Sequence, residues 1–205
     1  TGTATTPGAT ASVVISEFRT RGPSGGNDEF VEIYNNSDSP ADISGWKLMG
    51  SSNTAPTGAR ATVPANVVLP RRTHYLFVNT AAGGYSGAVP GNASYTTGIA
   101  DNGGVALTRA DNSIVDQGGV TTVNTGYREG TAIATQLTTN VDRGYERKPG
   151  GLSATLQDTD DNASDFQVTT PSTPQNLVLT ASPASVNFGS VAPGDSRTIT
   201  VSIRN

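Results

Sequence analysis

The sequence predicts an all-β protein with one main β-sandwich core. Short runs alternate apolar and polar residues, as in residues 74–78 (HYLFV) and 198–203 (TITVSI). The 24 glycines and 12 prolines divide the chain into short segments, and no segment keeps the spacing of an amphipathic helix. With 205 residues, 34% of them hydrophobic, the chain can bury one sandwich core and still carry an appendage.

The first group of strands is expected in residues 13–48 (VVISEFRTRGPSGGNDEFVEIYNNSDSPADISGWKL). Two apolar, β-branched-rich runs flank a Gly/Asn/Asp turn, and a third run follows a polar bend. Phe30 and Trp46 fall in these runs, and large aromatic side chains at strand positions bury heavily. We therefore expect both in the core.

The second group covers residues 145–176 (YERKPGGLSATLQDTDDNASDFQVTTPSTPQN). An Asp/Asn cluster precedes Phe166, a third expected core aromatic, and a Pro/Thr/Ser stretch closes the unit.

Together these segments resemble the lamin tail domain of the bacterial secreted type, an immunoglobulin-like sandwich. The matching positions are residues 15–18, 29–35, 43–48, 105–118, 146–147 and 158–166. Long polar insertions at residues 50–66 and 80–100 depart from the family pattern. The expected organisation is an N-terminal extended segment (1–11), the sandwich (12–168), a Pro/Thr linker (169–176) and a C-terminal segment (177–205).

The C-terminal segment resembles the opening of a second immunoglobulin-like module, of the ASPM, SPD-2 and Hydin group. A whole module needs about seven strands, and 29 residues hold three at most. Either its strands complete the sheet of a neighbouring copy, or the chain was cut at a domain boundary. For strand donation, the expected assembly residues are apolar: Leu177, Val178, Leu179, Val186, Phe188, Val191, Ile199, Val201 and Ile203.

Charge and composition argue against several classes of partner. The net charge is −4 and basic residues form only short runs, so a nucleic-acid partner is not expected. No apolar run approaches the roughly 20 residues of a membrane helix. Cysteine is absent, which excludes disulfides and thiolate chemistry. A Lys-poor composition rich in Thr, Ser, Gly and Asn is typical of secreted β proteins, so we expect an extracellular or cell-surface location.

Catalysis is not expected. The one histidine, His74, lies in the apolar alternation of residues 74–78, where a structural role is favoured. Asp28 and Glu32 would share a strand face, a pairing more typical of solvated surface than of an acid–base couple.

One acidic loop is a candidate calcium site. Asp158, Asp160 and Asn162 reproduce the first three ligand positions of a calcium loop, with Asp165 as a further ligand. Ala163 stands where that loop needs glycine, and Thr169 where it needs glutamate. The alternative is that these side chains cap a turn through backbone amides.

The function expected from the sequence is a non-catalytic secreted subunit that assembles with itself into an extracellular filament or surface structure by β-strand exchange. Either residues 177–203 or residues 1–15 would complete the sheet of the next subunit. Tyr85, Tyr95 and Tyr127 lie in Gly-rich segments of the kind that suit adhesive surfaces, so a cell-surface or glycan ligand is a further expectation. The alternative is a binding or accessory module of a larger secreted protein, such as a nuclease or other hydrolase.

Overall fold

The computed structural model describes most of the chain. The described residues are 12–121, 126–151, 153, 155–177, 180–182, 187, 189–190, 194–200 and 202–204. Two sheets pack face to face, and the apolar core lies between them. Within these ranges, no helix has the length and apolar character needed to cross a membrane.

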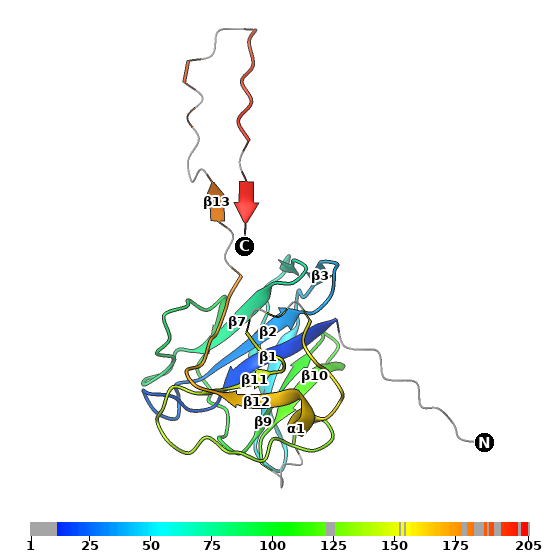
Figure 1. Ribbon diagram of the computed structural model, residues 1–205, viewed down its shortest axis with the longest axis vertical. Coiled ribbons are helices and arrows are strands. Elements are labelled where there is room, and N and C mark those ends of the chain that lie inside the picture. The colour runs from blue at the N-terminus through cyan, green and yellow to red at the C-terminus, as the bar shows by residue number, and fades with distance from the viewer. Residues whose placement is uncertain are drawn as a thin grey trace, which may run out of the picture.

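The larger sheet has six strands, in the order β12-β11-β1-β2-β7-β8, and Figure 1 shows its first five strands side by side. All neighbours are antiparallel except β7 and β8. The strands are β1 (Val13–Arg19), β2 (Phe30–Asn35), β7 (His74–Asn79), β8 (Ala93–Tyr95), β11 (Gly144–Arg147) and β12 (Phe166–Thr169).

The smaller sheet has four antiparallel strands, in the order β10-β9-β4-β5. They are β4 (Lys47–Ser51), β5 (Pro56–Thr62), β9 (Gly104–Thr108) and β10 (Ile114–Gly119). A short pair, β3 (Ala41–Asp42) with β6 (Val68–Leu69), lies outside both sheets.

The core follows from the alternation of each strand. Val31 and Ile33 on β2 point between the sheets, as Tyr75 and Phe77 do on β7. An aromatic group anchors one end: the ring centroid of Phe18 lies 4.9 Å from that of Tyr145 and 5.5 Å from that of Phe166. The six-stranded sheet also buries side chains on its outer face, including Phe30, Leu76 and Val78, because loops cover that face.

The all-β sandwich predicted from the sequence is confirmed, with differences in detail. The insertions at residues 50–66 and 80–100 contribute β5 and β8. Phe166 lies in the core, Phe30 is buried on the outer face, and Trp46 is only partly buried, packing on the core edge. One short helix was not foreseen, α1 (Asn162–Asp165), whose N-cap is Asp161.

The C-terminal segment contributes β13 (Thr180–Ser182) and β14 (Ser202–Arg204), which pair antiparallel with each other. The alternating pattern of residues 198–203 had predicted a longer strand, yet residues 198–200 are not in strand conformation. Isolated two-stranded ribbons are marginal in water, which accounts for the short ladder. Figure 1 shows this hairpin beyond the sandwich.

Candidate functional site

The main candidate site is on the outer face of the six-stranded sheet, where residues 172–177 cross the strands. We call this segment the strap. It starts near β11, passes over β1 and β2, and ends beside the residues that lead into β8. Every described residue of the strap except Thr173 is at least partly buried.

Three side chains accept the main-chain N–H groups of alternate strap residues. The N–H of Thr173 donates to both carboxylate oxygens of Glu17, at 3.1 Å each. The N–H of Gln175 donates to Glu32 Oε2. The N–H of Leu177 donates to Asn92 Oδ1 at 3.0 Å, and Asn92 Nδ2 donates back to the carbonyl of Leu177 at 3.0 Å. We call Glu17, Glu32 and Asn92 the strap site.

The ends of the strap are fixed by further contacts. The Ser172 hydroxyl donates to Asp142 Oδ1 at 2.6 Å, and Arg19 Nη1 donates to the Ser172 hydroxyl oxygen at 3.2 Å. At the other end, Asn176 Nδ2 donates to the carbonyl of Pro90 at 2.6 Å. The Leu177 side chain packs against the main core.

Glu17 and Glu32 are both almost fully buried, and they are direct cross-strand partners in the β1–β2 ladder. Burial raises the pKa of Glu17 to about 7 and raises that of Glu32 well above its usual value. Like charges directly opposite each other destabilise a sheet. Donors from the strap offset part of that cost, so the pair is an acceptor site for peptide main chain.

A small polar cavity of about 10 Å³ lies beneath the strap and includes His74 in its lining. This space suits one water molecule. His74 Nε2 is 3.7 Å from Glu32 Oε1, and burial lowers the pKa of His74 to about 4. The Ser16 hydroxyl donates to Glu32.

The second candidate is a buried ionic group around Arg147, which we call the Arg147 cluster. Arg147 Nη2 donates to both oxygens of Asp116, at 2.8 and 2.6 Å, and Nη1 lies 3.3 Å from Asp158 and 3.5 Å from Asp165. Its Nε donates to the carbonyl of Ile15 at 2.8 Å, and the N–H of Ile15 donates to Asp116 Oδ2. The Arg147–Asp116 pair therefore ties β10 of the smaller sheet to β1 and β11 of the larger one.

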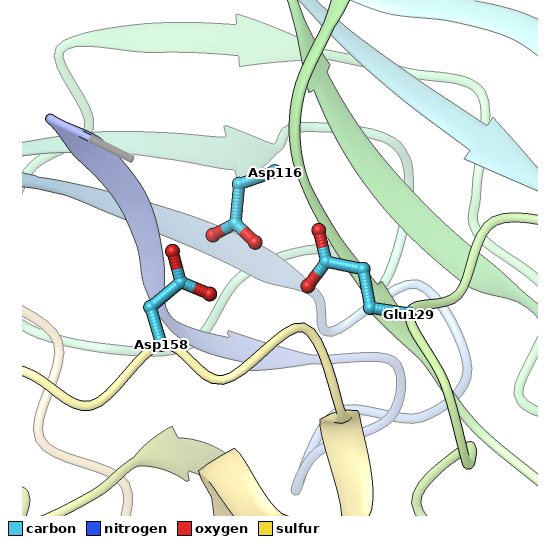
Figure 2. Close-up of side chains that lie close together, drawn as sticks. All are labelled: Asp116, Glu129 and Asp158. Carbon is cyan, nitrogen blue, oxygen red and sulfur yellow. The ribbon is translucent and has the colours of Figure 1, made fainter. Parts of the chain in front are cut away.

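Three carboxylates at this cluster converge. One oxygen each from Asp116, Glu129 and Asp158 lies within 4.8 Å of the others, and Figure 2 shows the three groups pointing toward one another. Burial raises the pKa of Glu129 to about 9, with the Asp116 charge adding to the shift. Carboxylate oxygens suit a hard cation such as Ca²⁺. Arg147, however, already pairs with Asp116 and Asp158, so part of the negative charge of the three carboxylates is neutralised within the protein.

The four predicted calcium ligands do not converge on one point. Asp158 belongs to the carboxylate group, whereas Asp160 is exposed with a φ of 57°. Asn162 Oδ1 accepts the N–H groups of Gly119 and Glu129, at 2.8 and 2.9 Å. Asp165 accepts the N–H and hydroxyl of Thr159, at 2.8 and 2.7 Å. Asn162 and Asp165 are thus used within the fold.

Capping, the alternative reading of this loop, is seen at Asp161. Its carboxylate accepts the N–H groups of Ser164 and Thr131, at 2.9 and 3.0 Å. These hydrogen bonds lower the pKa of Asp161 to about 2. The acidic loop therefore organises α1.

The predicted assembly residues fall mostly outside the described side chains. Leu177 is part of the strap and packs on its own subunit, and Ile199 is 38% exposed. Ile203 lies in β14, with only its backbone described. The other predicted assembly residues lie outside the described residues: Val178, Leu179, Val186, Phe188, Val191 and Val201.

The comparison with known families agrees with the sandwich and with the extent of the strands. The family model for the lamin tail domain matches residues 6–172. The chain belongs to the lamin tail domain family. The match ends where the strap begins, so it gives no support to the resemblance between the C-terminal segment and the ASPM, SPD-2 and Hydin group. No curated protein matches the chain.

The strap site of this lamin tail domain was not predicted from the sequence. Glu17 and Glu32 stand in the mostly apolar runs ISEF and VEIY, and a glutamate within such a run is a candidate for a buried carboxylate. Their pairing depends on the register of β1 with β2, which a bulge between Ile15 and Glu17 shifts. Residues 172–176 of the strap fall in the expected linker, residues 169–176, and Leu177 was expected among the assembly residues.

Proposed function

We propose that this lamin tail domain protein is a non-catalytic structural subunit that assembles with copies of itself, through its C-terminal hairpin, into an extracellular filament or surface structure. The observation that carries the proposal is the β13–β14 hairpin. Among the described strands it pairs only within itself, so both of its edges are open.

An open two-stranded ribbon gains stability by adding to another sheet. The hairpin backbone offers unpaired N–H and C=O groups along each edge, and strand addition satisfies them. Ile199, next to the hairpin, exposes 38% of its surface. If each copy donates its hairpin to the next, the contact is heterologous and extends without closing, as a filament requires.

The strap supports the same proposal because it separates an anchored part from a donated part. Hydrogen bonds to Glu17, Glu32 and Asn92 hold the chain as far as Leu177 on its own sandwich. Leu177, first counted among the donated residues, is better placed with the anchor. The donated part then starts beyond it, at β13.

The test is assembly of the full chain, followed by light scattering and negative-stain microscopy. Ile199→Asp should abolish fibres, because it replaces an exposed apolar side chain near β14 with a carboxylate, which cannot be buried in a contact without a partner. Ser196→Asp is the matched control, since it adds the same charge at an exposed polar position. Equal assembly of both variants would count against the hairpin as the contact.

A second candidate function is an accessory module within a larger secreted protein, such as a nuclease or other hydrolase. The anchored strap favours it, because a fixed exit direction would also position a neighbouring module. Under this function the purified chain stays monomeric at every concentration. A secreted location and an adhesive cell-surface or glycan ligand are part of the proposal in both forms. Tyr127, a half-buried loop tyrosine, is a candidate contact for such a ligand.

A further inference from the structure

The outer face of the six-stranded sheet carries a built peptide-binding arrangement. Glu17, Glu32 and Asn92 accept N–H groups from residues 173, 175 and 177, so they read every second residue of an extended main chain. Asn92 Oδ1 also accepts the N–H of Leu76 at 2.9 Å, which fixes its amide orientation. The site is therefore held rigid by the sheet itself.

The acceptors are costly without a ligand. Glu17 and Glu32 are each 2% exposed, and they face each other across two strands. Glu146 lies opposite Glu17 on the other side, in the β1–β11 ladder. Without the strap, Glu17 and Glu32 lose these N–H donors, and their like charges still face each other across the two strands. A face built this way favours occupation by an extended segment.

We propose that this face is an exchangeable peptide site, which binds residues 172–177 of a second copy with the same contacts that it makes to its own strap. The same sequence donates to the same acceptors in either arrangement. Exchange therefore costs little free energy beyond the conformational change at the hinge. Only residues 170 and 171 separate the end of β12 from the strap, and they would form that hinge. The proposal concerns the strap alone and does not depend on assembly through the hairpin.

The decisive experiment displaces the strap from its site in the full chain and leaves the residues of the site unchanged. The double substitution Thr173→Pro with Gln175→Pro removes two strap N–H donors and leaves Glu17, Glu32 and Asn92 unchanged. The probe is a fluorescein-labelled peptide of residues 171–179 (PSTPQNLVL), followed by anisotropy. The matched control is Thr173→Ala with Gln175→Ala, which keeps both N–H groups.

The Pro variant should bind the peptide saturably with one-to-one stoichiometry. The unmodified chain and the Ala control should bind far less. Their own strap has an effective concentration on the order of 1 mM, so about 10 μM peptide would occupy about one chain in a hundred. A peptide with proline at positions 173 and 175 should not bind. Failure of the folded Pro variant to bind the natural peptide overturns the proposal.

A second measurement avoids any dependence on how the Pro variant folds. The chain has no cysteine, so single cysteines can be placed in separate copies, as Pro90→Cys and Asn176→Cys. These positions meet where Asn176 Nδ2 donates to the Pro90 carbonyl. After refolding of the mixture and oxidation, exchange predicts a disulfide-linked heterodimer well above the level given by Arg71→Cys with Asn176→Cys. Equal levels in the two mixtures would contradict exchange, whether or not fibres form.

Discussion

Glu17 and Glu32 lie directly opposite each other in the β1–β2 ladder, and each accepts a main-chain N–H from the strap, from Thr173 and Gln175 respectively. Thr173 and Gln175, which are two residues apart in the strap, therefore bond to side chains on two neighbouring strands of the sheet. Neighbouring strands are about 4.8 Å apart and two extended residues span about 6.6 Å, so a segment crossing the strands obliquely keeps both contacts. The strap is therefore part of the sandwich, and the chain is held on the sheet as far as Leu177.

The buried glutamates predict how stability depends on pH. Burial raises the pKa of both Glu17 and Glu29 to about 7, above their ordinary 4.5. Between about pH 4.5 and 7 the folded chain therefore holds protons that the unfolded chain has released, so the free energy of unfolding falls as pH rises through this window. Urea titrations should give higher stability at pH 5.5 than at pH 8.5.

Two variants check the source of that dependence. Glu17→Gln and Glu29→Gln each remove one titrating group at nearly constant shape, so each should flatten the pH profile between pH 5.5 and 8.5. Ser196→Ala, which changes an exposed residue without a titrating side chain, serves as the control and should leave the slope nearly unchanged. Greater stability at pH 8.5 than at pH 5.5 would show that the pKa values of these carboxyl groups are not raised.

Arg147 is predicted to be the most sensitive charged residue of the described chain. It is fully buried and contacts Asp116, Asp158 and Asp165. Arg147→Met should cost about 3–5 kcal/mol in urea unfolding, because uncompensated carboxylates remain. Arg71→Met, at an exposed position, should change stability by less than about 0.5 kcal/mol.

A double substitution separates charge from packing at the same place. Arg147→Met combined with Asp116→Leu should recover part of the stability lost in Arg147→Met, because the second substitution removes the uncompensated charge of Asp116. If the double variant is as unstable as the sum of the two single variants, the pair is not energetically coupled.

Asn162 is predicted to matter for structure. Its side chain accepts the N–H groups of Gly119 and Glu129 and donates to the carbonyl of Gln117. Asn162→Ala should cost about 2 kcal/mol or more, because buried amides lose their acceptor. Asn140→Ala, at an exposed asparagine, is the control. Equal effects of the two substitutions on thermal unfolding would refute this role.

Calcium should have little effect on the unmodified chain. Arg147 already bonds to two of the carboxylates that could bind the ion, so we expect the melting temperature in 1 mM CaCl₂ to match that in EDTA within about 1 °C. A shift of several degrees that Asp158→Asn abolishes would instead establish a calcium site.

Much of the fold could be predicted because local patterns specify it. The apolar, β-branched-rich runs VVISEF and FVEIYN predicted β1 and β2. The pairings that build both sites were not predictable, because they join residues far apart in sequence. Arg147 meets Asp116 only through the packing of two sheets, and Glu17 meets Thr173 across 156 positions. Register and long-range contacts leave little trace in single segments.

In the loop that carries Asp158, predicted calcium ligands also have partners within the fold. Asp160 and Asn162 match the spacing of a calcium loop, yet backbone amides around α1 compete for the same side chains. Asn162 and Asp161 are used by those amides.

The central claim, assembly through the C-terminal hairpin, is tested most directly by light scattering with negative-stain microscopy on the full, unmodified chain over a range of concentrations. Our account predicts regular fibres whose length grows with concentration, and their loss in Ile199→Asp. A monomer at every concentration would contradict it and favour the accessory-module function.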